Sequence, residues 1–361
     1  MKVAKVRIEN TMNFKGPTEI ELSRFNVFIG KNGTGKSNML KIINRLPSTG
    51  INQSVPFAPF DNNFTLPQSI DGLMTLEDDD IRRISESRQF ASLPNDAPFG
   101  ALKMNLSKHK ELNLSRSWKG TGGQLSPAYR IDELAGIVYE NNRLQSTFYD
   151  IVFKEIQSKC LFLPDMRDLS YNFSLSDRPI VGASEFNTLN PGNIMSYVTR
   201  WKLNNREIYD SFVNECRKMI GEFDNANIEF GQAGSAVMSM ASRGLTSPIP
   251  GSEISKGSRE IMVIIGSLIL APPSSSILIE EPEVHLFKSA IRTLKDIMIQ
   301  KLKEKSLQIT LTTHSEIFLE GLDPHTDKSV RIFAFKKDPN DGSCSVRELK
   351  EEAEIAKFYD L

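Results

Sequence analysis

The chain has 361 residues, enough for two or three domains or for one large α/β unit with an insertion. Its 39% hydrophobic and 25% charged residues are ordinary for a folded globular protein and argue against a disordered chain. The 44 basic and 45 acidic side chains nearly cancel to a net charge of −1, so contact with nucleic acid or an anionic membrane would need a local patch.

Cysteine use and the apolar runs indicate the compartment. The three cysteines, Cys160, Cys216 and Cys344, are too few and too far apart for a disulfide framework or a cysteine zinc site, and they fit a reducing compartment. The first residues, MKVAKVRIEN, contain no apolar signal core. The longest apolar run, Ile261–Ala271, is too short to span a bilayer and predicts a buried helix. We therefore expect a cytoplasmic protein with no membrane partner.

The N-terminal segment predicts strands, a glycine loop and a helix in direct succession. Lys2–Glu9 and Thr18–Leu22 alternate polar and apolar residues, as half-buried strands do. Asn26–Ile29 is a short apolar strand that runs into glycine. Lys36–Leu46 places its apolar residues at helical spacing, and Pro47 ends the helix.

The middle of the chain is less regular. The acidic run Glu77–Asp80 predicts the solvated start of a helix, with Asp80 near its N-terminus. Gly100–Leu114 predicts a β-hairpin. The other expected elements are amphipathic helices at Ile131–Ser158 and Met195–Phe223 and a compact strand at Cys160–Leu163. The sequence pattern contains no internal repeat and no sustained heptad.

Strong patterning returns after Gly221. A hairpin is expected at Asn227–Phe230 and Ala236–Met240. It is followed by the buried helix, a strand at Ser276–Ile279, a helix with a basic face at Phe287–Lys303, and a strand at Leu307–Leu311. The segment after His314 has room for a strand or two and a helix. Alternating strands and helices predict a sheet with helices on both faces.

The segment Gly30–Ser37 reads GKNGTGKS and matches G-x-x-x-x-G-K-[ST] at every fixed position. Its glycines let the loop curl so that successive N–H groups point inward at phosphates, and the following helix aims its positive end at them. The lysine adds a cation for the β- and γ-phosphates, and the serine hydroxyl is a ligand for Mg²⁺. The residues expected to bind ATP are Asn32, Gly33, Thr34, Gly35, Lys36, Ser37 and Asn38.

Two acids and a histidine follow the predicted strands near the C-terminus. The sequence ILIEE ends an apolar strand with Glu280, which would hold Mg²⁺ directly or through water, and Glu281, the candidate base for an attacking water. His314 comes just after the next strand and is the second candidate catalytic residue, since a neutral imidazole there would reach a γ-phosphate or a polarised water.

A second anion-binding turn is expected at Ser255-Lys256-Gly257-Ser258, where a hydroxyl and a glycine precede a helix. One interpretation is a simple N-capping turn. The other is that Ser255 and Gly257 cap the nucleotide of a partner chain, which predicts a two-fold homodimer with two ATP molecules between the protomers, or a higher homo-oligomer.

These four features resemble, in content and order, the ABC-type ATPase heads of the SMC and RecF class, and most closely the OLD-like, AAA-annotated ATPases. The resemblance covers roughly residues 1–45 and 245–335. It assigns GKNGTGKS as Walker A, ISKGSRE as the signature, ILIEEPEVHL as Walker B with its D-loop, and TTHS as the His switch. It implies an α/β P-loop NTPase fold: a mixed sheet flanked by helices, formed by residues 1–45 and 245–361, with a large α+β insertion lobe at 46–244.

The resemblance leaves several family elements open. The Q-loop glutamine is either Gln53 or Gln68. Phe14 stacks on the nucleotide base or packs in the core. Arg167 senses the γ-phosphate or is structural, and His285 in the D-loop touches the opposite protomer or only packs.

The function implied is ATP hydrolysis that controls ATP-dependent dimerisation of the heads. The output would be a partner effector, such as a separate nuclease, because the segment after His314 is too short for the Toprim nuclease domain of OLD proteins; a role in anti-phage defence is one context. The alternative is an autonomous DNA-binding ATPase of the RecF or SMC kind, with a basic patch at Lys295, Lys301, Lys303 and Lys305. A transporter subunit fits the signature and the length poorly, and Glu281 argues against a non-hydrolysing ATP sensor.

Overall fold

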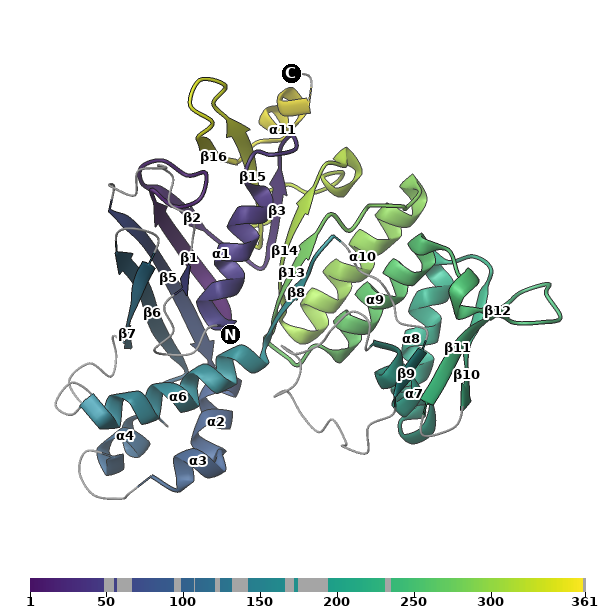
Figure 1. The fold of residues 1–361 in the computed structure, drawn as a ribbon, viewed down its shortest axis with the longest axis horizontal. Coiled ribbons are helices and arrows are strands. Elements are labelled where there is room, and N and C mark those ends of the chain that lie inside the picture. Colours follow the sequence, from purple (N-terminus) through teal and green to yellow (C-terminus); the bar gives the residue numbers. More distant parts are fainter. Residues whose placement is uncertain are drawn as a thin grey trace.

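The computed structural model of the chain describes residues 1–48, 55–56, 67–93, 99–106, 108–120, 124–131, 142–165, 172–174, 194–230 and 235–359. Among these residues, no helix is long and apolar enough to cross a membrane. Figure 1 shows three sheets, with helices packed between and around them.

The central sheet has the strand order β16-β15-β3-β14-β13-β8. Its strands are β3 (Phe25–Ile29), β8 (Cys160–Leu163), β13 (Ser276–Glu280), β14 (Gln308–Thr313), β15 (Val330–Lys337) and β16 (Cys344–Leu349). All neighbours run parallel except β15 and β16, which form an antiparallel hairpin. The sheet is therefore mixed, and the carboxyl ends of β3, β13 and β14 meet at one edge.

The central strands are apolar at nearly every position because both faces of the sheet are covered. On β3, Val27 belongs to one hydrophobic core and Phe28 to the other, and on β13 the same alternation separates Ile277 from Leu278. Continuous apolar runs of this kind are expected in parallel strands covered on both faces. The sequence could therefore predict strands here but not which side chain faces which core.

One face of the central sheet is covered by α1 (Lys36–Ser48), which lies between this sheet and an antiparallel one (Figure 1). The antiparallel sheet has the order β2-β1-β5-β6-β7-β4. Its strands are β1 (Lys2–Glu9), β2 (Thr18–Glu21), β4 (Val55–Pro56), β5 (Gln68–Glu77), β6 (Glu111–Gly120) and β7 (Gln124–Ile131). Leu40 and Ile43 of α1 share a hydrophobic core with Val6 of β1 and Phe28 of β3, so this helix packs against both sheets.

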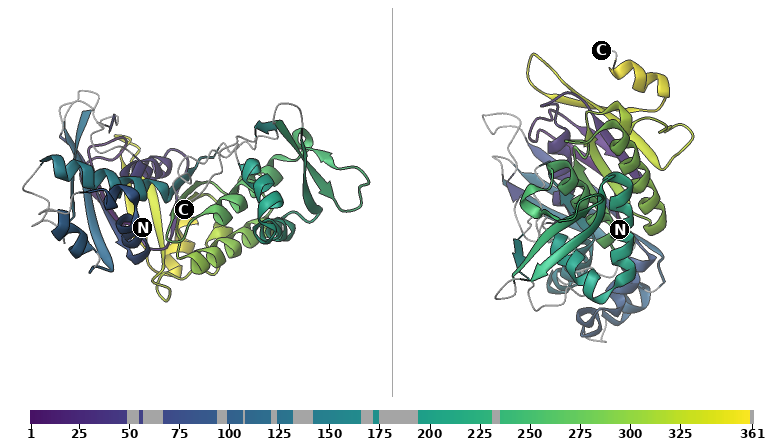
Figure 2. Two further views of the ribbon diagram at one scale, coloured as in Figure 1. Left: turned by 90° about the horizontal axis from the view of Figure 1, so that it is seen from below. Right: turned by 90° about the vertical axis from the view of Figure 1, so that its right-hand side faces the viewer.

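The other face is covered by α9 (Lys256–Leu270) and α10 (Lys288–Lys305). Beyond them lie α7 (Ile194–Asn204), α8 (Arg206–Met219) and a small sheet of β9 (Asn172–Ser174), β10 (Phe223–Phe230), β11 (Ser235–Ser242) and β12 (Ile249–Pro250). Figure 2 shows this small sheet and the six-stranded antiparallel sheet at opposite ends of the molecule. Single 3₁₀ turns occur at Gly251–Glu253 and Glu316–Phe318.

A further group of helices packs below the antiparallel sheet in Figure 1: α2 (Asp78–Glu86), α3 (Arg88–Ala91), α4 (Phe99–Leu106) and α6 (Asn142–Ser158). The start of α2 confirms the predicted helix at the acidic run. It is not a solvated start, however, because Asp80 is fully buried and pairs with Lys159, which is equally buried. The short helix α11 (Glu352–Tyr359) lies beside the β15–β16 hairpin.

Three predicted elements differ from the structure. The helix expected at Ile131–Ser158 is α6 at Asn142–Ser158, and Ile131 is the last residue of β7. The hairpin expected at Gly100–Leu114 is wrong, because this segment holds all of α4 after Phe99 and the start of β6, which pairs with β5 and β7. The single helix expected at Met195–Phe223 is two helices, since the Asn205 side chain accepts a hydrogen bond from the Ile208 N–H and caps the start of α8. The predicted hairpin of Asn227–Phe230 with Ala236–Met240 is confirmed.

The proposed division of the chain at residues 46–244 stays a prediction. The elements of this segment are distributed over the molecule: β5, β6 and β7 extend the sheet of β1 and β2, and β8 forms an edge of the central sheet. The helices α7 and α8 with the small sheet pack beyond α9.

Candidate functional site

The glycine loop connects the end of β3 to α1, as the motif predicts. Gly30, Gly33 and Gly35 have φ values of 152°, 75° and 96°, a region that glycine adopts readily. At Gly30, an added Cβ would lie 2.5 Å from the carbonyl oxygen of Phe335. At Gly35 it would lie 2.6 Å from Nδ2 of Asn13. The loop is thus shaped by conformation and by close packing against β15 and the β1–β2 turn.

Lys36 is held inside this loop. Its Nζ donates hydrogen bonds to the carbonyl oxygens of Gly30 at 2.7 Å and Lys31 at 3.1 Å, and it lies 3.1 Å from Nε2 of His314. The residue is only 5% exposed. Burial lowers the pKa of the Lys36 ammonium, against the opposing effect of the Glu281 and Glu283 carboxylates.

His314 lies between the glycine loop and Glu281, which follows β13. Its Nε2 lies 3.1 Å from Oε1 of Glu281, as well as close to Lys36. This proximity follows from the fold, because β14 lies between β3 and β13 and their carboxyl ends coincide. The imidazole of His314 is therefore in contact with both of the other predicted residues, Lys36 and Glu281.

Glu281 stands on a strained turn immediately after β13. Its φ is 40°, which is uncommon for a residue with a side chain, and its N–H donates to the carbonyl oxygen and the Oγ1 of Thr312 at 3.1 Å each. His285 further along the same turn also has a positive φ of 62°. Such outliers cluster at functional sites, where the surrounding structure maintains them. Glu280 is 5% exposed and is the last residue of β13.

Sequence reasoning missed Glu283. Its Oε1 accepts hydrogen bonds from Thr313 Oγ1 at 2.7 Å and from the His314 N–H at 2.6 Å, so it fixes the backbone that carries the imidazole. Burial raises the pKa of the Glu283 carboxyl, and the two hydrogen bonds oppose that rise. Its place two residues after Glu281 in EEPE was a signal that could have drawn attention to it.

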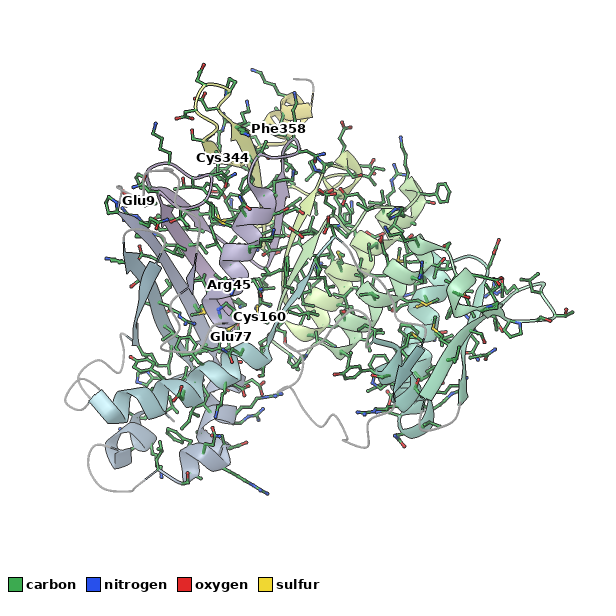
Figure 3. The ribbon with its side chains drawn as sticks, in the orientation of Figure 1. Glu9, Arg45, Glu77, Cys160, Cys344 and Phe358 are labelled. Carbon is green, nitrogen blue, oxygen red and sulfur yellow. The ribbon has the colours of Figure 1, made fainter. Side chains whose placement is uncertain are left out.

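A cavity of about 600 Å³ opens beside the loop. Gly30, Lys31, Asn32, Thr34 and His314 line one side, and Phe335, Lys336, Lys337 and Phe358 line the other. None of the described residues that line it is acidic, so the cavity favours an anionic ligand. Figure 3 shows Phe358 and Cys344 at the same end of the molecule, on α11 and β16. The aromatic and basic residues of β15 and α11 were not expected from the sequence.

The remaining loop residues lie at the start of α1. Ser37 is in its first turn, and Asn38 Nδ2 donates to Asn13 Oδ1 at 2.9 Å. Asn13 in turn lies against Gly35 and donates to the sulfur of Cys344 at 2.8 Å. The turn between β1 and β2 is thereby tied to both the loop and the β15–β16 hairpin.

Ser255 and Gly257 lie away from this cavity in the single chain. Ser255 is exposed and caps α9, because its Oγ accepts from the Ser258 N–H at 3.2 Å. A Cβ added at Gly257 would lie 2.6 Å from the carbonyl oxygen of His285, so the start of α9 packs directly on the turn after β13. His285 Nδ1 lies 3.4 Å from Oε1 of Glu260, whose side chain is fully buried.

The residues left open by the family resemblance are only partly placed. Gln68 begins β5, is 2% exposed, and donates to the carbonyl oxygen of Asn10, away from the cavity. Phe14 is fully buried in the core, which removes it as a stacking surface for a base. Gln53 and Arg167 lie outside the described residues.

The expected basic patch on α10 is wrong. Lys295 and Lys301 are buried; Lys295 donates to the carbonyl oxygen of Glu320 and Lys301 pairs with Glu304 at 2.8 Å. Lys305 donates to carbonyl oxygens at the end of α9, and burial lowers its pKa to about 8. Lys305 thus stabilises the carboxyl end of α9, and the buried Lys295 and Lys301 do not form a basic surface.

Two parts of the chain match models of ATPase families. Residues 1–94 match an AAA ATPase domain. Residues 155–320 match an AAA domain described as a putative AbiEii toxin of a type IV toxin–antitoxin system. Neither match spans half of the chain. No curated protein matches the sequence.

Solved structures with a similar fold are heads of SMC proteins. One is an SMC head bound to the C-terminal winged-helix domain of ScpA, with 13% identity, a TM-score of 0.56, and 99% of this chain and 100% of that chain covered. Another is an SMC head with an extended coiled coil, bound to the C-terminal domain of ScpA and derived from Pyrococcus furiosus, with 12% identity, a TM-score of 0.52, and 99% and 98% covered. The chain thus combines AAA ATPase sequence matches with the α/β fold of SMC heads, a P-loop NTPase fold.

Proposed function

We propose that this protein is an ATPase in which two copies close around two ATP molecules and separate after hydrolysis. The observation that carries the proposal is the contact of Lys36, His314 and Glu281 at the carboxyl edge of the central sheet. A cation can bind phosphate oxygens and a carboxylate can orient and deprotonate water, and a neighbouring imidazole can hydrogen-bond either one, so the three groups suit phosphoryl transfer to water. The AAA ATPase matches support nucleotide binding.

The residues present fit a triphosphate with a magnesium ion. The loop curls through glycine φ values, α1 begins at Lys36, and the Lys36 ammonium lies inside the loop, where phosphate oxygens could replace the carbonyl oxygens that it now binds. Mg²⁺ keeps several waters and takes one or two protein oxygens besides substrate phosphates. Ser37 and Glu280 would supply those oxygens. Among the described residues there is no dedicated cluster of three or more His, Cys, Asp or Glu, and such an ion does not need one.

In the reaction, Lys36 would leave the carbonyl oxygens of its own loop and bind the β- and γ-phosphates. Glu281 would orient the attacking water and accept its proton, and the oxygen of that water would form the new bond to the γ-phosphorus as the bond to the β-γ bridging oxygen breaks. His314 would hold the γ-phosphate or the water from the side. Glu283 keeps His314 in place through its backbone N–H.

The second copy completes the site. Ser255 is exposed at the start of α9, where its hydroxyl and the N–H groups of the first turn suit an anion. In a two-fold arrangement, Ser255 and Gly257 of each copy would contact the γ-phosphate held by the other. ATP binding would then stabilise the dimer, and loss of the γ-phosphate would release it.

The output we propose is control of a partner effector, with a separate nuclease as one candidate and anti-phage defence as one setting. The description of the second family model as a toxin supports this output. The two similar SMC heads are each bound to a ScpA domain, which supports partner binding by heads of this fold. An autonomous DNA-binding ATPase remains the second candidate on the fold, but three of the four lysines proposed to contact DNA are engaged in other contacts.

The test is the size of the protein by light scattering without nucleotide, with ATP and Mg²⁺, and for Glu281→Gln. We expect monomers without nucleotide, transient dimers with ATP, and trapped dimers in the variant, with the ATP hydrolysis rate lowered by about 10²–10⁴-fold. Glu316→Gln, an exposed acid past β14, is the matched control and should behave as wild type. A wild-type protein that binds ATP but never changes size would contradict the dimer mechanism. Duplex DNA added at two salt concentrations tests the second candidate, since binding through phosphates weakens steeply with salt.

A further inference from the structure

Phe287 is the most exposed of the large apolar side chains in the described part of the chain, with 84% of its surface accessible. It is the N-cap residue of α10, directly after the turn that carries Glu281, Glu283 and His285. A single exposed apolar residue needs no explanation by itself. Phe287 is notable because it directly follows the turn that carries part of the candidate site.

The turn before Phe287 is packed on the start of α9. A Cβ at Gly257 would lie 2.6 Å from the carbonyl oxygen of His285 and 3.6 Å from Cδ2 of Leu286. Phe287 directly follows this turn and therefore lies near the start of α9, which Ser255 caps. In the proposed dimer, a surface that meets Ser255 would come close to this phenyl ring.

The cavity beside the glycine loop has the chemistry to receive an aromatic ring. Phe335 and Phe358 line it, and the ammonium of Lys336 lies 5.9 Å from the ring centre of Phe358. At about 600 Å³ it is open enough for a phenyl group. The same cavity borders Lys31 and Asn32 of the loop that is expected to hold ATP.

We propose that Phe287 of each copy inserts into this cavity of the other copy and packs against Phe358 of the partner subunit. The inference rests on the proposed function, because a Ser255 that reaches the partner's triphosphate carries Phe287 to the rim of the partner's loop. The two-fold axis repeats the contact, so each dimer contains it twice. A buried aromatic anchor inside a pocket is the usual centre of binding energy in an interface.

The first test is a double-mutant cycle on the ATP-dependent dimer, in a Glu281→Gln background that blocks hydrolysis. Phe287→Ala and Phe358→Ala should each weaken self-association by about tenfold or more, and the double variant should be no weaker than the weaker single variant. Leu203→Ala is the matched control, because Leu203 is 61% exposed at the end of α7 and should leave the dimer unchanged. Circular dichroism melting checks that Phe358→Ala remains folded.

The second test is a disulfide between copies. The three native cysteines are buried, so a Phe287→Cys, Phe358→Cys protein offers one accessible pair. Oxidation should give a covalent dimer with ATP and Mg²⁺ and none without nucleotide, because the two Cβ atoms must approach within about 4.5 Å. Each single cysteine variant is the control for non-specific crosslinking.

The outcomes separate this inference from the proposed function. A wild-type protein that binds no ATP, or does not self-associate with it, overturns both. ATP-dependent dimers that tolerate both alanine variants, or variants whose losses multiply, overturn only the Phe287–Phe358 contact. If Phe358→Ala instead weakens ATP binding by the monomer, the cavity holds the nucleotide itself and the contact is likewise overturned.

Discussion

Nε2 of His314 lies 3.1 Å from Nζ of Lys36 and also 3.1 Å from Oε1 of Glu281. A ring nitrogen accepts a hydrogen bond when unprotonated and donates one when protonated, so it cannot serve Lys36 and Glu281 in the same protonation state. The imidazole is therefore a shared partner for which the cation and the carboxylate compete. If bound phosphates drew Lys36 away, the His314 ring would be available to hydrogen-bond with Glu281.

His314→Ala removes this shared partner. We expect ATP hydrolysis to fall by about 10–100-fold while ATP affinity changes by less than about threefold, because in the proposed mechanism the ring would act on water and γ-phosphate rather than on the bound triphosphate as a whole. Steady-state phosphate release and a fluorescent-nucleotide titration measure the two quantities. His325→Ala, in the exposed segment before β15, is the control. A variant that loses affinity and rate equally would contradict the role given to the ring.

Lys36→Ala should abolish most nucleotide binding. In the proposed mechanism the ammonium would make charge-assisted hydrogen bonds to phosphate oxygens, so we expect ATP affinity to fall by about 10–100-fold in calorimetric titrations with Mg²⁺. Lys41→Ala removes an exposed lysine from the same helix and keeps the net charge equal to that of the first variant. Equal affinities for the two variants would show that the loop lysine does not contact the ligand.

Gly257→Ala tests the packing between α9 and the turn after β13. Its Cβ would lie 2.6 Å from the His285 carbonyl oxygen, so one of the two segments must shift. We expect a loss of about 1–3 kcal/mol in the free energy of unfolding by urea, together with weaker ATP-dependent dimerisation. Gly221→Ala is matched, since nothing lies within 4 Å of a Cβ at that glycine. Unchanged stability in Gly257→Ala would mean that the turn is looser than the structure shows.

Glu283→Gln should change how stability depends on pH. The pKa of Glu283 is raised in the folded protein above its ordinary value of 4.5, so the group favours folding below pH 4.5 and loses that contribution as pH rises through the folded pKa. The glutamine oxygen can still accept from Thr313 and from the His314 N–H. The unfolding free energy of the variant relative to wild type should therefore increase from pH 4 upward and then level off.

Urea denaturation at half-unit pH steps measures this difference. Glu222→Gln, which removes an exposed acid, controls for the general effect of one fewer negative charge. A difference between Glu283→Gln and wild type that stays flat across the pH range would contradict the raised pKa.

The site was largely predictable where local sequence determines geometry. Gly30–Ser37 has a pattern that only a curled loop satisfies, and the approach of Glu281 to His314 follows once both are placed at carboxyl ends of parallel strands. Glu283 was not predictable in the same way, because its hydrogen bond to the His314 N–H depends on a turn with a positive φ at Glu281. Phe335 enters the site because β15 pairs with β3, and Phe358 because α11 lies beside the β15–β16 hairpin; no local pattern reveals either placement.

In the middle of the chain, by contrast, local sequence did not determine the structure. The alternation in Gly100–Leu114 is compatible with a strand throughout, yet only its last part pairs, because β6 takes its register from β5. The break at Asn205 was also invisible to periodicity, since the apolar residues of α7 and α8 fill the same core. In both cases, partners distant in the sequence decided between local alternatives.

The position of β3 in its sheet has a consequence for synthesis. Both neighbours of β3 are late in the chain: β14 begins at Gln308 and β15 at Val330, whereas β3 ends at Ile29. At translation rates of about 5–20 residues per second, the apolar segment that leads into the loop waits roughly 15–60 seconds for its partners. A nascent chain would therefore expose this segment to holding chaperones, and the glycine loop could not reach its folded position until β14 and β15 had left the ribosome.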